Sequence, residues 1–255
     1  MALRTVITLT FGDQAENHVG MQQLGDMVPE GQGMHLDDLQ VIAAHMPDGS
    51  TTLHTLHEGI EGASPAYVLV IHNGVNHVMM DGLYSYRDVF EEQRRLEWDQ
   101  KAFMYGRVVN KKARFNLCYD IGREQEPDYE QRRGRIYDIT KLPATYALYE
   151  GMRAKFGPKV QNLKGEGNLY DDLRTNGIGW HGDSERRIVV AARLGADMPI
   201  YYQWYHRGER VGPRIEVPLR GGDMYIMSEK AVGTDWKRSS ILTLRHATGA
   251  DAYTK

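Results

Sequence analysis

The sequence predicts an α+β fold, in which a C-terminal sandwich or barrel of short strands follows a small N-terminal α/β unit and two helices. The 255 residues allow one large domain or two small ones, with a buried core. Beyond residue 157, short β-like runs alternate with Gly, Asp and Asn, which is typical of a sandwich or barrel. Before residue 157, longer stretches with few helix breakers indicate helices.

The N-terminal elements are predicted from local patterns. Val6–Phe11 (VITLTF) is a β-rich run, and Leu36–Met46 has two aspartates in its first turn, as helices often do. Tyr67–His72 and Val75–Met80 flank an Asn-Gly pair, which favours a hairpin with a type I′ turn. We therefore expect a small α/β domain of unknown role over residues 1–82 and a second domain over residues 83–255.

Two helices and six strands are expected in the second domain. Tyr84–Met104 is rich in Glu, Gln and Arg and predicts a linking helix. Pro143–Phe156 begins with proline and precedes Gly157, which predicts another helix. The expected strands are Gly177–Trp180, Ile188–Leu194, Pro199–His206, Arg214–Pro218, Met224–Met227 and Ile241–His246.

Charge is unevenly distributed along the chain. Residues 1–90 contain two basic and eleven acidic residues, a net charge of −9, whereas residues 91–255 contain 29 and 23, a net charge of +6. Two interpretations remain open. In one, the two parts are solvated surfaces that attract each other; in the other, the basic part faces an anionic ligand or nucleic acid.

Composition also bears on the cellular setting. No run approaches the ~18 apolar residues that a membrane helix needs, so no membrane partner is expected. The first residues lack the pattern of a signal peptide. Cys118 is the only cysteine, which excludes an internal disulfide and fits a reducing compartment. We expect an intracellular protein, cytoplasmic or nuclear.

The stretch that carries most chemical information is Asn176–Arg186, which contains His181 and Asp183. Residues i and i+2 of a strand point to the same face, so this imidazole and carboxylate can chelate one metal ion. A facial triad of two His and one carboxylate leaves coordination positions free on Fe(II). Alone the pair is weak evidence, because a His near an Asp is more often a hydrogen-bonded surface pair.

The motifs around this pair resemble those of the AlkB family of Fe(II)/2-oxoglutarate-dependent dioxygenases. An Asn-x-Tyr pair precedes a segment like IGWH-x-D-x-E, and then come a strand ending in Leu-Gly, a Gly-Asp strand ending in Met and a closing strand ending in Arg. Ala113–Gly122 resembles a further family segment. The resemblance covers about residues 105–249 and implies a double-stranded β-helix, a cupin-like jelly roll, flanked by helices.

The resemblance also implies roles for single residues. His181 and Asp183 would ligate the iron, and Asn168 and Tyr170 would hydrogen-bond 2-oxoglutarate. Arg245 would pair with a carboxylate of this cosubstrate through its planar guanidinium. The structural alternatives are turn formation and core packing for Asn168 and Tyr170, and a surface salt bridge for Arg245.

The chain departs from the family pattern at the third metal ligand. The family has a His two residues after an aromatic residue, but here Arg238 stands two residues after Trp236. Three outcomes are open: His246 ligates if the final strand is bulged, Asp235 supplies an oxygen instead, or the metal site is incomplete. The family's Arg for the distal carboxylate falls on Ser239, and the neighbouring Arg238 is the candidate substitute.

The implied reaction couples oxidative decarboxylation of 2-oxoglutarate with O₂ to hydroxylation of a substrate. Our first hypothesis is hydroxylation or oxidative demethylation of a flipped or single-stranded nucleic-acid base. The basic clusters Lys111–Arg114 and Arg132–Arg135 support it, as does Glu185, where the family has a base-contacting carboxylate. The alternative is a hydroxylase of a protein side chain or small metabolite. A third hypothesis is a catalytically impaired binding module.

Overall fold

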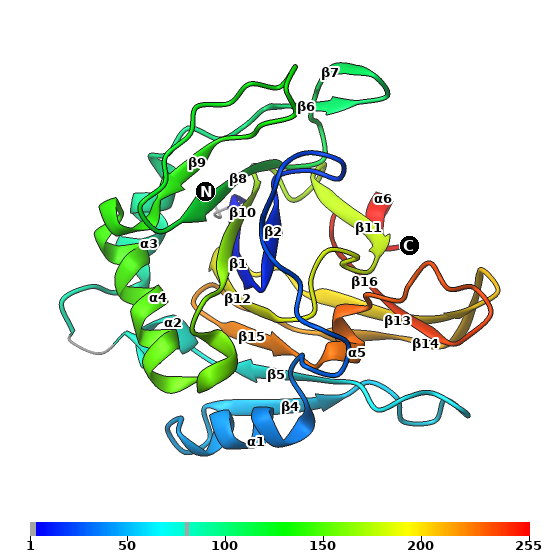
Figure 1. Cartoon of the computed structure of the whole chain (residues 1–255). Coiled ribbons are helices and arrows are strands. Elements are labelled where there is room, and N and C mark those ends of the chain that lie inside the picture. The colour runs from blue at the N-terminus through cyan, green and yellow to red at the C-terminus, as the bar shows by residue number, and fades with distance from the viewer. Residues whose placement is uncertain (1–3, 80–81) are drawn as a thin grey trace.

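Two β-sheets of unequal size face each other in the computed structural model, which describes residues 4–79 and 82–255 (Figure 1). In spatial order, the larger sheet consists of β4 (Thr51–Thr55), β5 (Tyr67–Ile71), β15 (Met224–Met227), β12 (Val189–Gly195), β1 (Val6–Gly12), β10 (Lys164–Tyr170), β8 (Phe115–Asp120) and β9 (Ile136–Asp138). The smaller sheet consists of β11 (Gly177–His181), β16 (Thr243–Gly249), β13 (Ile200–His206) and β14 (Glu209–Val217). The expected α+β class is therefore correct, and the arrangement is compatible with a β-sandwich.

Helices cover the outer face of the larger sheet. Those with side chains in this outer core are α1 (Leu36–Ala44), α2 (Gly74–Val78), α3 (Tyr86–Arg94) and α4 (Pro143–Lys155). The remaining elements are the hairpins β2 (Gln14–Glu16) with β3 (Gln23–Gly25) and β6 (Lys101–Met104) with β7 (Arg107–Asn110), the short helices α5 (Glu229–Val232) and α6 (Asp251–Thr254), and the 3₁₀ turns Ile139–Lys141 and Pro158–Val160. Within the described residues, no helix is long and apolar enough to cross a membrane.

Strand β1 lies in the middle of the larger sheet. It pairs antiparallel with β10 on one side and with β12 on the other. Its residues alternate between two buried environments: Ile7, Leu9 and Phe11 face the helices, whereas Thr8 and Thr10 line a cavity between the sheets. The unit expected over residues 1–82 is therefore not a separate body, because its first strand is hydrogen-bonded to two strands of the C-terminal half.

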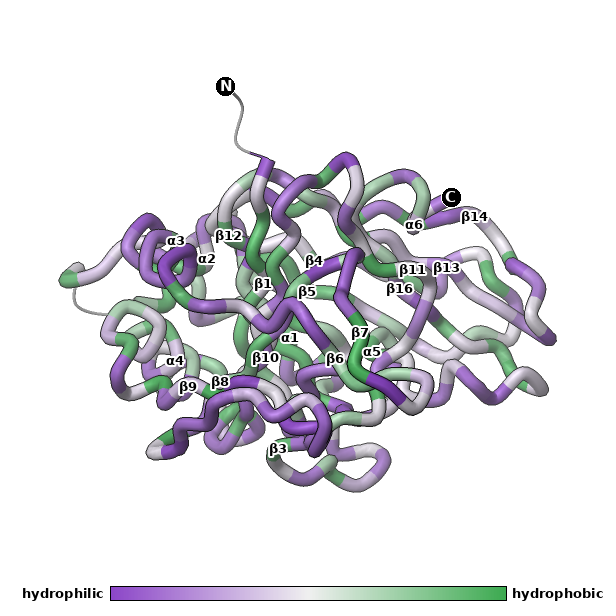
Figure 2. The backbone as a smooth tube through the Cα atoms, turned by 90° about the horizontal axis from the view of Figure 1, so that it is seen from above, coloured by the Kyte–Doolittle hydropathy of each residue, from purple (hydrophilic) through white to green (hydrophobic). Residues whose placement is uncertain are grey.

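The space between the two sheets holds a second hydrophobic core. Val189, Ala191 and Met227 of the larger sheet contribute to the same buried cluster as Tyr202 and Trp204 of the smaller one. The indole of Trp204 donates a hydrogen bond of 2.6 Å to the backbone oxygen of Leu56. Figure 2 shows that central strands such as β1 are largely hydrophobic, whereas the peripheral loops are mostly hydrophilic.

Most of the expected elements are confirmed. The strand at Val6–Phe11 and the helices at Leu36–Met46 and Pro143–Phe156 form within two residues of the predicted bounds. Each of the six strands expected after residue 157 overlaps an observed strand, although β14 begins five residues earlier than predicted and β16 extends to Gly249. The short strands β2, β3, β6 and β7 and the sheet strands β4, β8, β9 and β10 were not predicted.

Two expected elements are wrong. Asn73 does adopt the left-handed conformation that a type I′ turn requires, with φ 54°. However, the backbone N–H of Val75 donates to Gly222, and the chain winds into α2, whose Val75 and Val78 enter the outer core. Met80, the end of the expected hairpin, lies outside the described residues.

The expected linking helix over Tyr84–Met104 ends early, at Arg94 in α3. Trp98 then turns into the core, where its indole donates to the backbone oxygen of Gln93. The segment that follows pairs as β6 with β7 around Tyr105 and Gly106, which both have positive φ. A favourable helix composition is thus overridden by a tight turn.

Replacing Leu9 by Ala tests the central position of β1. Leu9 is fully buried, so we expect Leu9→Ala to lower the free energy of unfolding by about 2–5 kcal/mol. Leu53→Ala is the matched control, because Leu53 lies on the edge strand β4 and is 38% exposed. Urea unfolding of both variants measures the difference, and equal effects would contradict this placement.

Candidate metal centre

Adjacent strands of the smaller sheet bring His181 and His246 together. His181 is the last residue of β11, and it lies directly opposite His246 of β16 in the antiparallel pairing. The centroids of their rings are 4.4 Å apart. The register of the β11–β16 pairing shifts between Ile178 and His181. The irregular part of the pairing is therefore next to His181.

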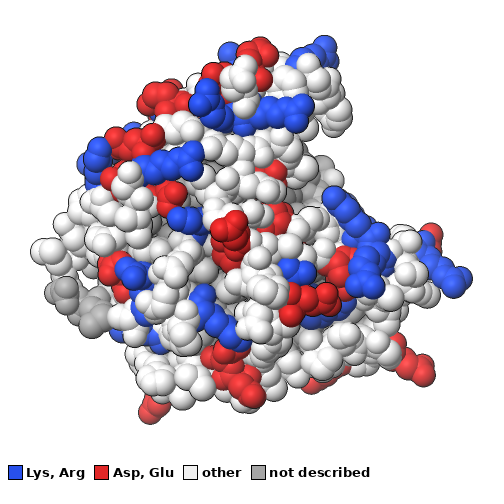
Figure 3. Space-filling view, in the orientation of Figure 1, with Lys and Arg blue, Asp and Glu red and all other residues white. Residues whose placement is uncertain are grey.

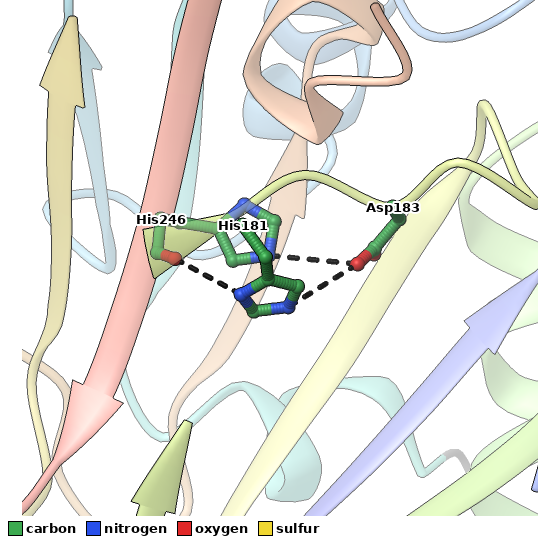
Figure 4. Close-up of side chains that lie close together, drawn as sticks. All are labelled: His181, Asp183 and His246. Atoms are coloured by element: carbon green, nitrogen blue, oxygen red, sulfur yellow. Dashed lines mark hydrogen bonds and ion pairs between the residues drawn. The ribbon is translucent and has the colours of Figure 1, made fainter. Parts of the chain in front are cut away.

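Asp183 completes a cluster of three side chains with ligand atoms (Figure 4). Its Oδ1 lies 3.5 Å from Nε2 of His181 and 3.6 Å from Nε2 of His246. The three potential ligand atoms all lie within 4.8 Å of one another. Metal–ligand bonds of about 2.0–2.2 Å fit this spacing, so one ion could contact all three.

Backbone groups around the cluster fix the orientation of the His181 ring and the turn that leads from His181 to Asp183. Nδ1 of His181 lies 2.8 Å from the carbonyl oxygen of Gly179 and 3.1 Å from that of His246. A proton on Nδ1 satisfies these acceptors and leaves the lone pair of Nε2 facing the cluster. The turn to Asp183 needs Gly182, because a Cβ there would lie 2.1 Å from the backbone oxygen of Gly233.

The electrostatic environment keeps His181 and Asp183 in the forms that bind metals. Burial lowers the pKa of His181 to about 3, so its imidazole is neutral at pH 7. Burial by itself would raise the pKa of Asp183, but the hydrogen bond from His246 and the positive charge of Arg186 lower it overall. Neutral imidazoles and an ionised carboxylate are the forms that coordinate a cation.

Arg186 organises the carboxylates behind Asp183. Its guanidinium is buried and contacts Glu166, lies 2.7 Å from Glu185 and is 3.9 Å from Asp183. Burial nevertheless raises the pKa of Glu185, and burial raises that of Glu16, which lines the same cavity, to about 7. The cluster therefore borders a group of buried carboxylates, two of which have raised pKa values.

A cavity of about 1060 Å³ connects the cluster with the interior of the sandwich. On the side of the larger sheet it is lined by Thr8, Asn168, Tyr170, Arg193 and Tyr225. The loop between β2 and β3 also lines it, and there Val19 is 76% exposed. The volume is sufficient for more than one small molecule beside a metal ion.

Comparison with known proteins identifies one informative relative. No family model matches the chain. An uncharacterized protein of Acanthamoeba polyphaga mimivirus is 47% identical over 261 residues, and the match covers 99% of both chains. The chain belongs to the family of this viral protein. The family thus includes the N-terminal segment that supplies β1, together with the region that supplies the metal cluster.

Six of the candidate site residues selected from the sequence line the cavity in this member of the family. They are His181, Asp183, His246, Asn168, Tyr170 and Glu185. The amide of Asn168 is already engaged, because its Oδ1 accepts from Arg114 at 2.8 Å and its Nδ2 donates to Glu166 at 3.0 Å. Tyr170 is buried, which raises its pKa, and its side chain borders the cavity.

Arg245 does not lie in the cavity, so the role expected for it is wrong. Neighbouring residues of a strand point to opposite faces, and His246 takes the inward position. The guanidinium of Arg245 instead lies 4.0 Å from the ring centroid of Tyr205 and 5.3 Å from that of Trp236. The side chains of β16 thus alternate between the two faces of the sheet as expected, and Arg245 is on the face opposite to His246.

Arg238 and Asp235 also lie elsewhere. Both line a separate cavity of about 690 Å³, and Asp235 accepts a hydrogen bond of 2.7 Å from Lys230. Asp235 does not belong to the cluster of possible ligands, and neither Asp235 nor Arg238 lines the cavity beside that cluster. His246 completes the cluster of possible ligands, so the chain offers a candidate for the third ligand position.

Arg193 is the cavity residue that sequence reasoning missed. It is 1% exposed and lies in β12 within the run Val189-Val-Ala-Ala-Arg-Leu-Gly. A single arginine inside an otherwise apolar, fully buried strand is a signal that could have been used, because an arginine is almost never fully buried unless it has a partner. The sequence predicted the strand that contains Arg193, but not that the side chain of Arg193 faces the cavity.

The two histidines among the three proposed ligands can be tested by metal binding. We expect His181→Ala and His246→Ala each to weaken binding of Mn²⁺ by more than about 100-fold, because removing a ligand should cost more than removing a residue that only orients one. Asp235→Ala is the control and should bind normally. Isothermal titration calorimetry provides the affinities, and normal binding by His246→Ala would contradict the assignment.

The low pKa of His181 predicts a pH-dependent stability of the metal-free protein. In the unfolded chain this imidazole takes up a proton near pH 6.5, whereas in the folded chain it does so only near pH 3. Stability therefore falls as the pH decreases below 6.5. At pH 5.5 we expect His181 to account for a loss of about 1 kcal/mol, measured as the difference between the unfolding curves of wild type and His181→Gln. Parallel pH profiles would contradict this.

Proposed function

We propose that this protein is an Fe(II)/2-oxoglutarate-dependent dioxygenase of AlkB type built on a double-stranded β-helix. The observation that carries the proposal is the inward-facing set His181, Asp183 and His246 at one end of a large cavity. Two imidazoles and one carboxylate form the donor set of non-heme Fe(II) oxygenases. The sequence motifs that resemble this class supply two of the three ligands.

The path of the chain between the sheets supports the jelly-roll part of the proposal. From β10 onward the chain alternates: β10 in the larger sheet, β11 in the smaller, β12 in the larger, the hairpin β13–β14 in the smaller, β15 in the larger and β16 in the smaller. A jelly roll has eight such strands in two sheets. Here β1, which precedes the others in sequence, takes the eighth place, between β10 and β12.

The residues around the cluster fit the bound groups. When bound, Fe(II) with 2-oxoglutarate and O₂ would supply the oxidising chemistry. His181, Asp183 and His246 would hold the ion and leave its other positions open. The carbonyl oxygens at Nδ1 of His181 and the charge of Arg186 near Asp183 keep these ligands oriented and ionised appropriately. The buried walls of the sandwich would limit the access of water.

A nucleic-acid base is the substrate that we propose first. Glu185 and Trp236 both line the cavity, and a carboxylate with an aromatic ring suits hydrogen bonding and stacking of a flipped base. Basic side chains gather on the β6–β7 side and on the β11 side of the face seen in Figure 3, with acidic side chains between them. A single strand could follow the basic flanks while one base enters the cavity.

One observation favours the alternative, a protein side chain or small metabolite. The basic cluster over residues 132–135 is largely neutralised within the molecule. Arg133 pairs with Asp128 at 3.3 Å, and Arg135 is buried against Glu97, Asp99 and Glu126. Arg132 packs over the ring of Phe103. These arginines are therefore less available to phosphates than the sequence suggests.

Succinate formation tests the reaction class. With Fe(II), 2-oxoglutarate and O₂, we expect wild type and Asp235→Ala to release succinate, and His246→Ala to release at least about 100-fold less because the ion is not held. Addition of a methylated single-stranded oligonucleotide should stimulate release and yield formaldehyde.

Absence of both succinate and a visible absorption band on anaerobic mixing of the protein with Fe(II) and 2-oxoglutarate would contradict the reaction class. Succinate release that ignores oligonucleotides but responds to peptides or metabolites would instead select the alternative substrate.

A further inference from the structure

We propose that Arg193 anchors the carboxylate of 2-oxoglutarate that is remote from the metal, from the middle of the larger sheet. The proposal rests on the proposed function, and it assigns to β12 a task that the sequence motifs had suggested for Arg245 or Arg238. It is carried by the burial of Arg193, its unused hydrogen-bond donors and its position in the same cavity as the metal cluster.

The guanidinium of Arg193 is buried without an anionic partner. Its Nη1 donates to the hydroxyl of Thr8, but its Nε and Nη2 have no hydrogen-bond partner. Among residues 4–79 and 82–255, no carboxylate forms an ion pair with it. An uncompensated buried charge is strongly unfavourable, whereas a carboxylate can accept two parallel bonds from one guanidinium.

The surroundings of Arg193 resemble a binding site more than a structural ion pair. Thr8 lies directly opposite Arg193 in one strand pairing and opposite Asn168 in the other, so three polar side chains cross the sheet in one row. The Arg193 guanidinium lies 5.8 Å from the ring centroid of Tyr225, and Tyr225 and Tyr170 line the same cavity. The cavity wall around Arg193 is therefore polar.

Other arginines of the cavity are already committed. Arg186 contacts the carboxylates of Glu166 and Glu185, and Arg114 donates to Asn168 and is partly exposed. Arg245 and Arg238 lie outside the cavity. Arg193 therefore remains as the buried cation that can receive an anion from the cavity, and the possible metal ligands His181, Asp183 and His246 line the same cavity.

The test uses the full-length protein under anaerobic conditions with Fe(II). Binding of 2-oxoglutarate is followed by the visible absorption band, and Mn²⁺ affinity is measured by calorimetry. We expect Arg193→Met to bind Mn²⁺ as wild type does but to bind 2-oxoglutarate on the order of 100-fold more weakly, because the remote carboxylate loses its partner. Pyruvate, which lacks that carboxylate, should bind equally weakly to both proteins.

Arg245→Met is the matched control and should leave 2-oxoglutarate binding unchanged. Arg193→Lys, which keeps the charge and loses the fork, should be intermediate, and it serves if Arg193→Met does not fold. Equal 2-oxoglutarate affinity in wild type and Arg193 variants would overturn the anchor and leave the proposed function intact. Failure of metal-loaded wild type to bind 2-oxoglutarate at all would overturn both.

Discussion

The pairing of β1 between β10 and β12 is the constraint on which the rest of the architecture depends. Without it, the larger sheet would be split between the strands that carry Asn168 and Arg193. The same strand faces the helix layer with apolar side chains and the cavity with threonines. One run of seven residues thus joins the sheet, closes the outer core and contributes a hydroxyl to the cavity wall.

The metal cluster depends on a second pairing, in which β11 and β16 set His181 opposite His246. Antiparallel neighbours with both side chains on the inner face necessarily approach each other, and Gly182 then lets the chain turn closely enough for Asp183 to join them. Burial keeps His181 neutral, and the nearby positive charge of Arg186 helps to keep Asp183 ionised. The strands that carry the two histidines and the strand that carries Arg193 belong to facing sheets, so the cavity between the sheets lies between the possible metal ligands and the buried guanidinium.

The sequence predicted those parts of the fold that are encoded locally. The apolar run of β1, the Pro-to-Gly bounds of α4 and the short C-terminal strands all follow from nearest neighbours along the chain. The partners of β1 could not be predicted, because they lie more than 150 residues away and nothing local specifies them. For the same reason the first 82 residues were mistaken for a separate unit.

The site was predicted to a similar extent. His181 and Asp183 are two residues apart, so the period of a strand sufficed to place them together. His246 was favoured only on condition of a bulge, since Arg245 was assumed to face the cosubstrate as well. The structure resolves this conflict by turning Arg245 outward, and the buried cation of the cavity comes from β12, where no motif had drawn attention to it.

Anomalous diffraction from crystals grown with Mn²⁺ and a 2-oxoglutarate analogue tests whether these three side chains hold a metal ion. We predict one strong manganese peak in contact with His181, His246 and Asp183, with the analogue in the cavity beside it. A manganese peak at other side chains, or none at these three under saturating metal, would contradict it.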